Sequence, residues 1–329
     1  MATTPSTDET EPDTAAYAEQ DKLGPLGGKL SIFDDPAELR RALVAEVAAA
    51  ADTARDAVAA VDRDPAGAVH TYRKALRRAR AVLALVADAL PRSERRAIVR
   101  ALREARRALG AARDQTVVPD ALAAVELDES DRDTARAILS ATEQAVPPVA
   151  ELSQLLAEGA ARAAAQVEAL EASLPRMIAW SIVARGLRRT YAAARHARKD
   201  AKRSTRSFHR WRRRTKELMY QLELLAGYAG SRTADLHREL EEVADTQGAA
   251  VDLLMLRDLV RAHATGISPD AIARLAATLE AQLEDLVPRS RRAARELFRA
   301  KPRKFARRVT RRVRRDTRAI ATSDELDAS

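Results

Sequence analysis

Two stretches of the chain repeat one arrangement of basic residues behind a histidine. In both, basic side chains follow the histidine at three, four and seven positions. The first copy comprises His70, Arg73, Lys74, Arg77 and Arg80, and the second comprises His209, Arg212, Arg213 and Lys216. Arginine contacts phosphate oxygens through two parallel hydrogen bonds, lysine adds a point charge, and histidine donates from both ring nitrogens when protonated. These residue types predict a site that binds an anion, more tightly below about pH 6.5.

An apolar seam accompanies each basic row. The seam of the first stretch comprises Val69, Tyr72, Leu76, Ala79, Leu83, Val86 and Leu90, and that of the second comprises Phe208, Trp211, Thr215, Leu218, Leu222 and Leu225. Alternating spacings of three and four indicate helices packed on other helices. The basic rows fall about 140° away by the ~100° step per residue. A basic helical face is most often only solvated, but a pattern repeated in register with the same seam favours a function.

The composition predicts an all-α protein. Among the 329 residues, aromatics make up 3%, there are 11 glycines, and alanine dominates the apolar 46%. The absence of cysteine excludes disulfides and thiolate metal sites. We find neither a secretory signal nor an uncharged apolar stretch long enough to cross a bilayer, so we expect no membrane insertion and a cytoplasmic location.

Basic blocks give the chain a net charge of +9. Residues 195–216 and 299–318 each hold eleven lysines or arginines against one acidic residue. Such blocks imply an anionic partner: nucleic acid, a phosphate polymer or an acidic membrane surface.

Turn and breaker residues divide the chain into two halves. We expect helices over 36–61, from after Gly67 to Leu90, 92–109, 175–203, 205–228, around Gln247 to Asp252, 269–286, and from Pro288 to about 320 with an interruption at Pro302. A long helical region is expected over 130–172, with a break or kink at Pro147-Pro148. The predicted organisation is a disordered acidic tail over 1–30, a first bundle over 31–174, a second over 175–320 and a frayed end over 321–329. A duplicated pair of bundles would have approximate two-fold symmetry. The two histidine helices could then lie side by side, with their basic rows facing a shared groove.

Other functions fit the residues less well. His70 and His209 are surrounded by cations that repel a divalent metal, and no HExxH, GxxxxGK[ST] or nucleophile-elbow motif occurs, so we expect no catalysis, metal or cofactor. Nucleic acid is the alternative partner. Single strands usually need aromatic platforms, whereas Tyr72, Phe208 and Trp211 fall on the seams. A duplex would need one exposed recognition helix, and the basic residues are spread over several helices. A ligand that is phosphate along its whole length fits best.

Five motifs in order resemble the CHAD domain, the conserved histidine α-helical domain. They are HxxRKxxRR over 70–78, HxxRRxxK over 209–216, LGAARD over 109–114 with a GxxxD counterpart over 248–252, LRRTY over 187–191, and KPRKF over 301–305. The resemblance covers about 31–318. It implies two pseudo-symmetric antiparallel helical bundles around a basic central groove, binding of inorganic polyphosphate, and association with polyphosphate granules. No ExExK motif of a joined triphosphate-hydrolysing domain occurs, so we expect a stand-alone, non-enzymatic binder.

The resemblance also assigns site residues. It places the polyphosphate contacts on the nine basic residues of the two histidine stretches. Further contacts are expected at Arg188, Arg189, Arg195, Lys199, Lys301 and Lys304. Asp114 and Asp252 are better explained as helix caps than as residues that orient cations. We expect His196 on a solvated basic face, and His237 and His263 at the surface.

Overall fold

A computed structural model of the chain describes residues 36–107, 122, 125–142, 148–226, 231–262 and 266–313. The described helices are α3 (Pro36–Ala60), α4 (Pro65–Leu85), the 3-10 turn η1 (Ala87–Ala89), α5 (Arg92–Arg107), α7 (Glu129–Thr142), α8 (Val149–Ser173), α9 (Trp180–Asp200), α10 (Thr205–Ala226), α11 (Ser231–Ala262), α12 (Pro269–Leu297) and a helix over 302–313. These ranges contain no strand, so the prediction of an all-α fold is confirmed.

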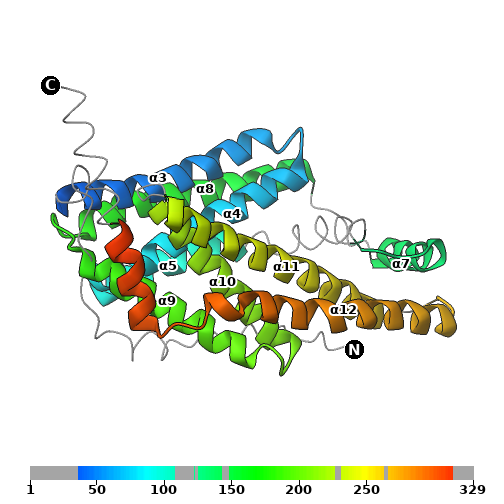
Figure 1. The fold of residues 1–329 in the computed structure, drawn as a ribbon. Helices are drawn as coiled ribbons and strands as arrows, with labels where there is room; N and C mark the ends of the chain where they lie inside the picture. The colour runs from blue at the N-terminus through cyan, green and yellow to red at the C-terminus, as the bar shows by residue number, and fades with distance from the viewer. Residues whose placement is uncertain are drawn as a thin grey trace.

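The helices α3, α4, α5 and α8 pack together as one bundle (Figure 1). At the start of α4, Asp64 accepts a hydrogen bond from the Gly67 amide at 2.8 Å, and Pro65 takes the first helical position, where a missing N–H costs nothing. All seven residues of the predicted seam are buried, although α4 ends at Leu85, so that Val86 and Leu90 lie beyond it, on either side of η1. This burial confirms the predicted seam. Its physical reason is that a packed helix keeps one apolar stripe toward its neighbours.

A second bundle comprises α9, α10, α11 and α12, with the helix 302–313 against α9. Every residue of the α10 seam is buried. The Tyr191 ring stacks on Phe305 with centroids 3.8 Å apart, and its hydroxyl donates to the carbonyl of Leu297 at 2.8 Å. Burial and these contacts fix Tyr191, and burial raises its pKa to about 12.

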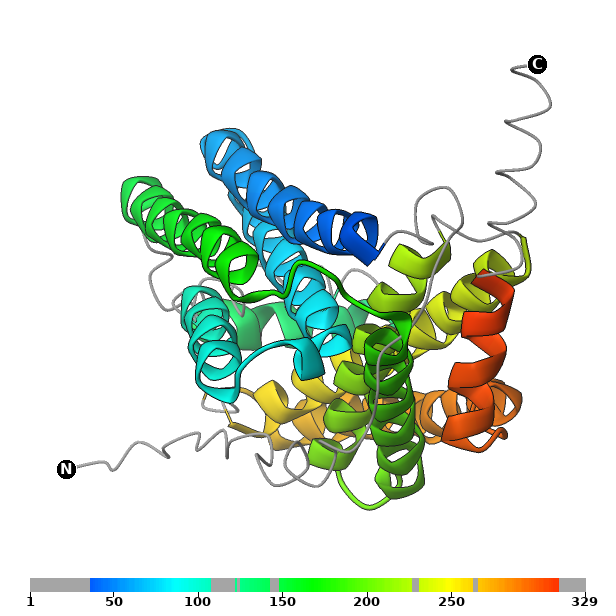
Figure 2. The same cartoon turned by 90° about the vertical axis from the view of Figure 1, so that its left-hand side faces the viewer.

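The two bundles meet along α4, which contacts both α9 and α10. Figure 2 shows the blue to cyan helices with α8 on one side, and the lime to red helices on the other. At Gly186 of α9, an added Cβ would lie 2.1 Å from the carbonyl oxygen of Leu85. Only a residue without a side chain permits this approach, so glycine sets the spacing of the junction.

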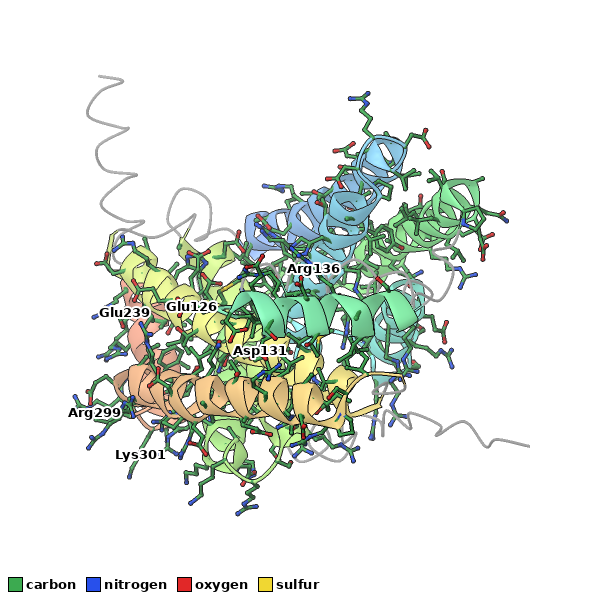
Figure 3. The ribbon with its side chains drawn as sticks, turned by 90° about the vertical axis from the view of Figure 1, so that its right-hand side faces the viewer. Glu126, Asp131, Arg136, Glu239, Arg299 and Lys301 are labelled. Atoms are coloured by element: carbon green, nitrogen blue, oxygen red, sulfur yellow. The ribbon has the colours of Figure 1, made fainter. Side chains whose placement is uncertain are left out.

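Helix α7 packs mainly against α12 and α11, although it precedes α8 in the chain. Asp131 is 1% exposed and accepts a hydrogen bond from the Thr278 hydroxyl at 2.7 Å. Arg274 lies 3.4 Å from the same carboxylate. Figure 3 shows Asp131 on the side of α7 that faces α12, and Arg136 on the opposite side. A helix from the first half of the sequence thus covers part of the second bundle.

Several predicted boundaries are wrong. Helix α12 continues through Pro288 to Leu297, because a proline inside a long packed helix removes one hydrogen bond without breaking the packing. The predicted helix over 175–203 begins only at Trp180. The helical region over 130–172 consists of two helices, and because α7 ends at Thr142 and α8 begins at Val149, it agrees with the break predicted at Pro147-Pro148. Asp252 lies in the middle of α11, so it caps no helix. The motif over 109–114, with Asp114, and also His263 lie outside the described residues.

Candidate polyanion-binding site

The basic row of α4 is graded in exposure. His70 and Lys74 are exposed, Arg77 and Arg80 are half-buried, and Arg73 is only 5% exposed. Arg73 and Arg80 lie nearest the seam by helical geometry, and Arg73 is the more buried because it reaches α5. His70 and Lys74 are therefore the groups of this row that solvent, and a dissolved anion, reach most easily.

Arg73 holds α4 against α5. Its Nη1 donates to the carbonyl oxygen of Arg106 at 3.3 Å, in the last turn of α5. The last carbonyls of a helix lack partners within the helix and carry partial negative charge, so a guanidinium there stabilises the helix end. Arg73 has this structural role in addition to any contact with a ligand.

On α10, Arg213 is exposed, and His209, Arg212 and Lys216 are half-buried. The Arg212 guanidinium lies over Gly248 of α11, where Nη2 is 3.5 Å from the position that a Cβ would take. The second histidine stretch and the GxxxD segment, which the sequence analysis identified as separate motifs, are therefore in contact.

Lys216 lies between acidic and basic neighbours. Its Nζ is 3.5 Å from the carboxylate of Asp245 and 3.8 Å from Sδ of Met219. Burial lowers the pKa of Lys216, and Arg212 lowers it further, while Asp245 opposes both effects. A bound phosphate would favour the charged form of this lysine.

The histidine helices α4 and α10 contact each other. Gln221 Nε2 donates to the carbonyl oxygen of Ala81 at 2.9 Å. Arg78 pairs with Glu46 of α3 at 2.9 Å and with Glu223 of α10 at 2.7 Å, and these carboxylates raise its pKa even though burial opposes them. Arg78 is thus neutralised, whereas it was part of the basic motif in the sequence.

Tyr220 is the residue at this crossing that sequence reasoning missed. It is buried, and burial raises the pKa of its hydroxyl. Arg77 of α4 and Arg212 of α10 both lie close enough to lower that pKa. Tyr220 therefore lies at the crossing of the two histidine helices. The only sequence signal was a polar aromatic beside the seam.

Arg189, one of the expected contacts on α9, is buried in the protein. It forms an ion pair with Asp88, and both side chains are almost fully covered. Arg188 on the same helix is half-buried. Arg195 donates through Nε to the carbonyl oxygen of Phe298 at 3.0 Å. The remaining expected residues, Lys199, Lys301 and Lys304, are exposed.

Two further histidines differ in setting. His196 is exposed, as expected, and its Nε2 is 3.3 Å from the Asp200 carboxylate. His237 is half-buried rather than at the surface, because its position on α11 turns it partly inward. In the part of the chain that the structure describes, no group of three or more His, Asp or Glu residues could hold a metal ion. None of the described helices is both long and apolar enough to cross a membrane.

Comparisons with known proteins agree with this fold. The crystal structure of the CHAD domain from the plant Ricinus communis is similar, with a TM-score of 0.51 and 20% identity, over 80% of this chain and 92% of that chain. No curated protein matches the sequence. The CHAD domain family matches residues 36–261, which include both histidine helices but not the KPRKF segment. The chain therefore belongs to the CHAD domain family.

Proposed function

We propose that this protein binds inorganic polyphosphate through the basic rows of α4 and α10, without chemistry on the chain. The observation that carries the proposal is the contact between the two histidine helices, which Gln221 of α10 fixes by its hydrogen bond to the carbonyl oxygen of Ala81 in α4. Cations on two rigid, touching helices can bind successive groups of one polyanion. Association with polyphosphate granules in the cytoplasm would follow from this affinity.

The crossing point supports a two-fold relation between the bundles. An offset of 139 residues relates His70 to His209, and it also relates Ala81 to Tyr220. Ala81 is bonded to Gln221, the next residue along. The two repeated helices therefore cross close to positions that are equivalent in the repeat. A crossing of this kind is expected where an approximate two-fold axis relates the two helices. We propose that both rows border one basic groove around this axis.

Exposure decides which residues test the proposal. Lys74 and Arg213 occupy equivalent positions in the repeat, and both are exposed. Reversing the charge of these two side chains should therefore disturb the fold less than a change at the buried members of the rows. The double variant Lys74→Glu/Arg213→Glu should weaken binding of long-chain polyphosphate about tenfold per contact, from roughly 1.5 kcal/mol per charge-assisted hydrogen bond. The logarithmic salt slope should also become shallower by about one unit per lost contact.

A matched control separates local contacts from net charge. Arg55→Glu/Arg136→Glu changes the charge by the same amount at side chains that are 64% and 65% exposed and in local ion pairs. Fluorescence titration at one fixed salt should show near-unchanged affinity for this control. Equal weakening by both double variants would mean that only net charge matters, and would refute the site.

Nucleic acid remains the rival partner for these cations. Competition distinguishes the two: we expect excess polyphosphate to displace duplex DNA and RNA readily at one salt concentration, and nucleic acid to displace polyphosphate poorly. Stronger competition by either nucleic acid would favour the rival function.

A further inference from the structure

A second group of arginines lies where two side chains of α9 reach the end of α12. Arg195 and Arg198 come from α9, and Arg291 and Arg295 come from α12. Arg198 Nη2 donates to the carbonyl oxygen of Arg291 at 2.5 Å, and Arg195 Nε donates to that of Phe298 at 3.0 Å, so side chains of α9 link this helix to the end of α12. We call these four residues the α9–α12 arginine cluster.

Within the described ranges, no carboxylate pairs with any member of this cluster. Acidic residues nearby in sequence have other partners: Asp200 lies 3.3 Å from His196 and 3.0 Å from Arg203, and Glu296 lies 3.0 Å from Arg299. Burial lowers the pKa of Arg198, and the other three members of the cluster lower it further. The cluster thus holds four like charges without a matching anion from these segments.

Backbone carbonyls offset only part of this charge. Arg195 and Arg198 each donate to one carbonyl in the last two turns of α12. The C-terminal end of a helix carries about half a negative charge, so the ends of α9 and α12 together supply about one against four positive charges. Most of the guanidinium N–H donors remain for another acceptor, since each guanidinium has five.

We infer that the α9–α12 arginine cluster is a second anion site, which binds a phosphate anion of two or more phosphate groups. Several planar guanidinium groups favour phosphate, whose oxygens accept paired hydrogen bonds. Four positive charges favour a multivalent ligand over a single phosphate. Figure 3 shows Arg299 and Lys301 at this end of α12, extending away from the helices. Arg299 is paired with Glu296, so of these two side chains Lys301 is the one that adds positive charge at this end of α12.

The choice of phosphate rests on the proposed function, so the test must separate the two sites. We would titrate tripolyphosphate by calorimetry into the Lys74→Glu/Arg213→Glu protein, in which the site on α4 and α10 is disabled. Adding Arg291→Gln/Arg295→Gln should weaken the remaining binding at least tenfold. These two side chains are chosen because the α9 arginines hold α12 through backbone carbonyls, which the substitutions keep.

The control is Arg289→Gln/Arg292→Gln, which makes the same charge change at exposed positions of the same helix. It should alter the affinity for tripolyphosphate less than twofold. Without phosphate, Arg291→Gln/Arg295→Gln should also raise the thermal midpoint, because it relieves repulsion between like charges. A lower midpoint would show that the cluster stabilises the fold without a ligand, and would overturn the inference.

Long-chain polyphosphate provides the second arm. If Lys74→Glu/Arg213→Glu weakens long-chain binding about tenfold per contact, while Arg291→Gln/Arg295→Gln leaves tripolyphosphate binding unchanged, the proposed function stands and the second site is refuted. If instead Lys74→Glu/Arg213→Glu leaves the affinity for long chains unchanged, and Arg291→Gln/Arg295→Gln weakens tripolyphosphate binding, the second site stands and the first is refuted. If Arg291→Gln/Arg295→Gln weakens the binding of tripolyphosphate but not that of long-chain polyphosphate, the cluster is a site for free short phosphates.

Discussion

Arg189 provides the sharpest test of how α9 is held against the first bundle. Its guanidinium pairs with Asp88, and the two side chains are 6% and 7% exposed. Arg185 lies 3.3 Å from the same carboxylate and is 23% exposed. Arg189 Nη2 also donates to the carbonyl oxygen of Ala84 at 3.4 Å. These contacts join α9 to η1 and to the end of α4, so Arg189 is expected to stabilise the fold rather than bind polyphosphate.

Removal of one partner from a buried ion pair typically costs about 3–5 kcal/mol. In Arg189→Met, Asp88 keeps Arg185, so we expect a loss near the lower limit, about 3 kcal/mol. In Asp88→Ala, two arginines lose their shared anion, and the loss should approach about 5 kcal/mol. The double variant Asp88→Ala/Arg189→Met should lose less free energy of unfolding than the sum of the two single losses. The reason is that neither Arg189 nor Asp88 then remains buried without the other.

Urea unfolding followed by circular dichroism measures these losses, and Arg188→Met on the same helix serves as the control. Polyphosphate affinity is measured on the folded variants. A loss below about 1 kcal/mol for Arg189→Met, together with weakened polyphosphate binding, would refute the structural assignment and return Arg189 to the ligand contacts.

Three further predictions concern the junction, the site and α7. Gly186→Ala should destabilise the protein by about 1–3 kcal/mol or more, because the added Cβ would lie 2.1 Å from the Leu85 carbonyl oxygen. Urea unfolding measures this loss. A loss below about 0.5 kcal/mol would show that α4 and α9 separate easily at this point. Burial lowers the pKa of Lys216, and a bound phosphate should raise it again. The contribution of Lys216 to affinity is then complete below the pKa of the free protein and is lost as the pH rises through the pKa of the complex; calorimetry in two buffers should detect proton uptake in the wild type at alkaline pH, and less in Lys216→Arg. Asp131→Ala should remove the link to Thr278 and Arg274 and speed hydrogen exchange in α7 but not in α4; unchanged exchange in α7 would contradict the importance of that link.

Local periodicity predicted the helices well. The seams on α4 and α10 could be identified because the spacing of apolar residues reports directly which side of a helix is covered. Pro288 gave a wrong boundary because the rest of α12 packs well enough to keep a helix with one missing hydrogen bond.

Which basic side chains form ion pairs within the protein could not be predicted in the same way. Arg188 and Arg189 are adjacent and identical in type, yet only Arg189 reaches the Asp88 carboxylate, 101 residues away in sequence. Arg78 likewise continues the basic motif but is neutralised by acids from two other helices. Which arginine meets a carboxylate depends on tertiary packing, and a single sequence does not encode that pairing locally.

The position of α7 means that the two halves of the polypeptide cannot be separated cleanly. A fragment that ends at Leu174 would carry α7 with Ala135 and Ile138, both fully covered in the intact chain, open to water. A fragment that starts at Pro175 would expose the part of α12 that α7 covers. Each piece made alone should be prone to aggregate, whereas co-expression of the two should let them reassemble into a complementing pair.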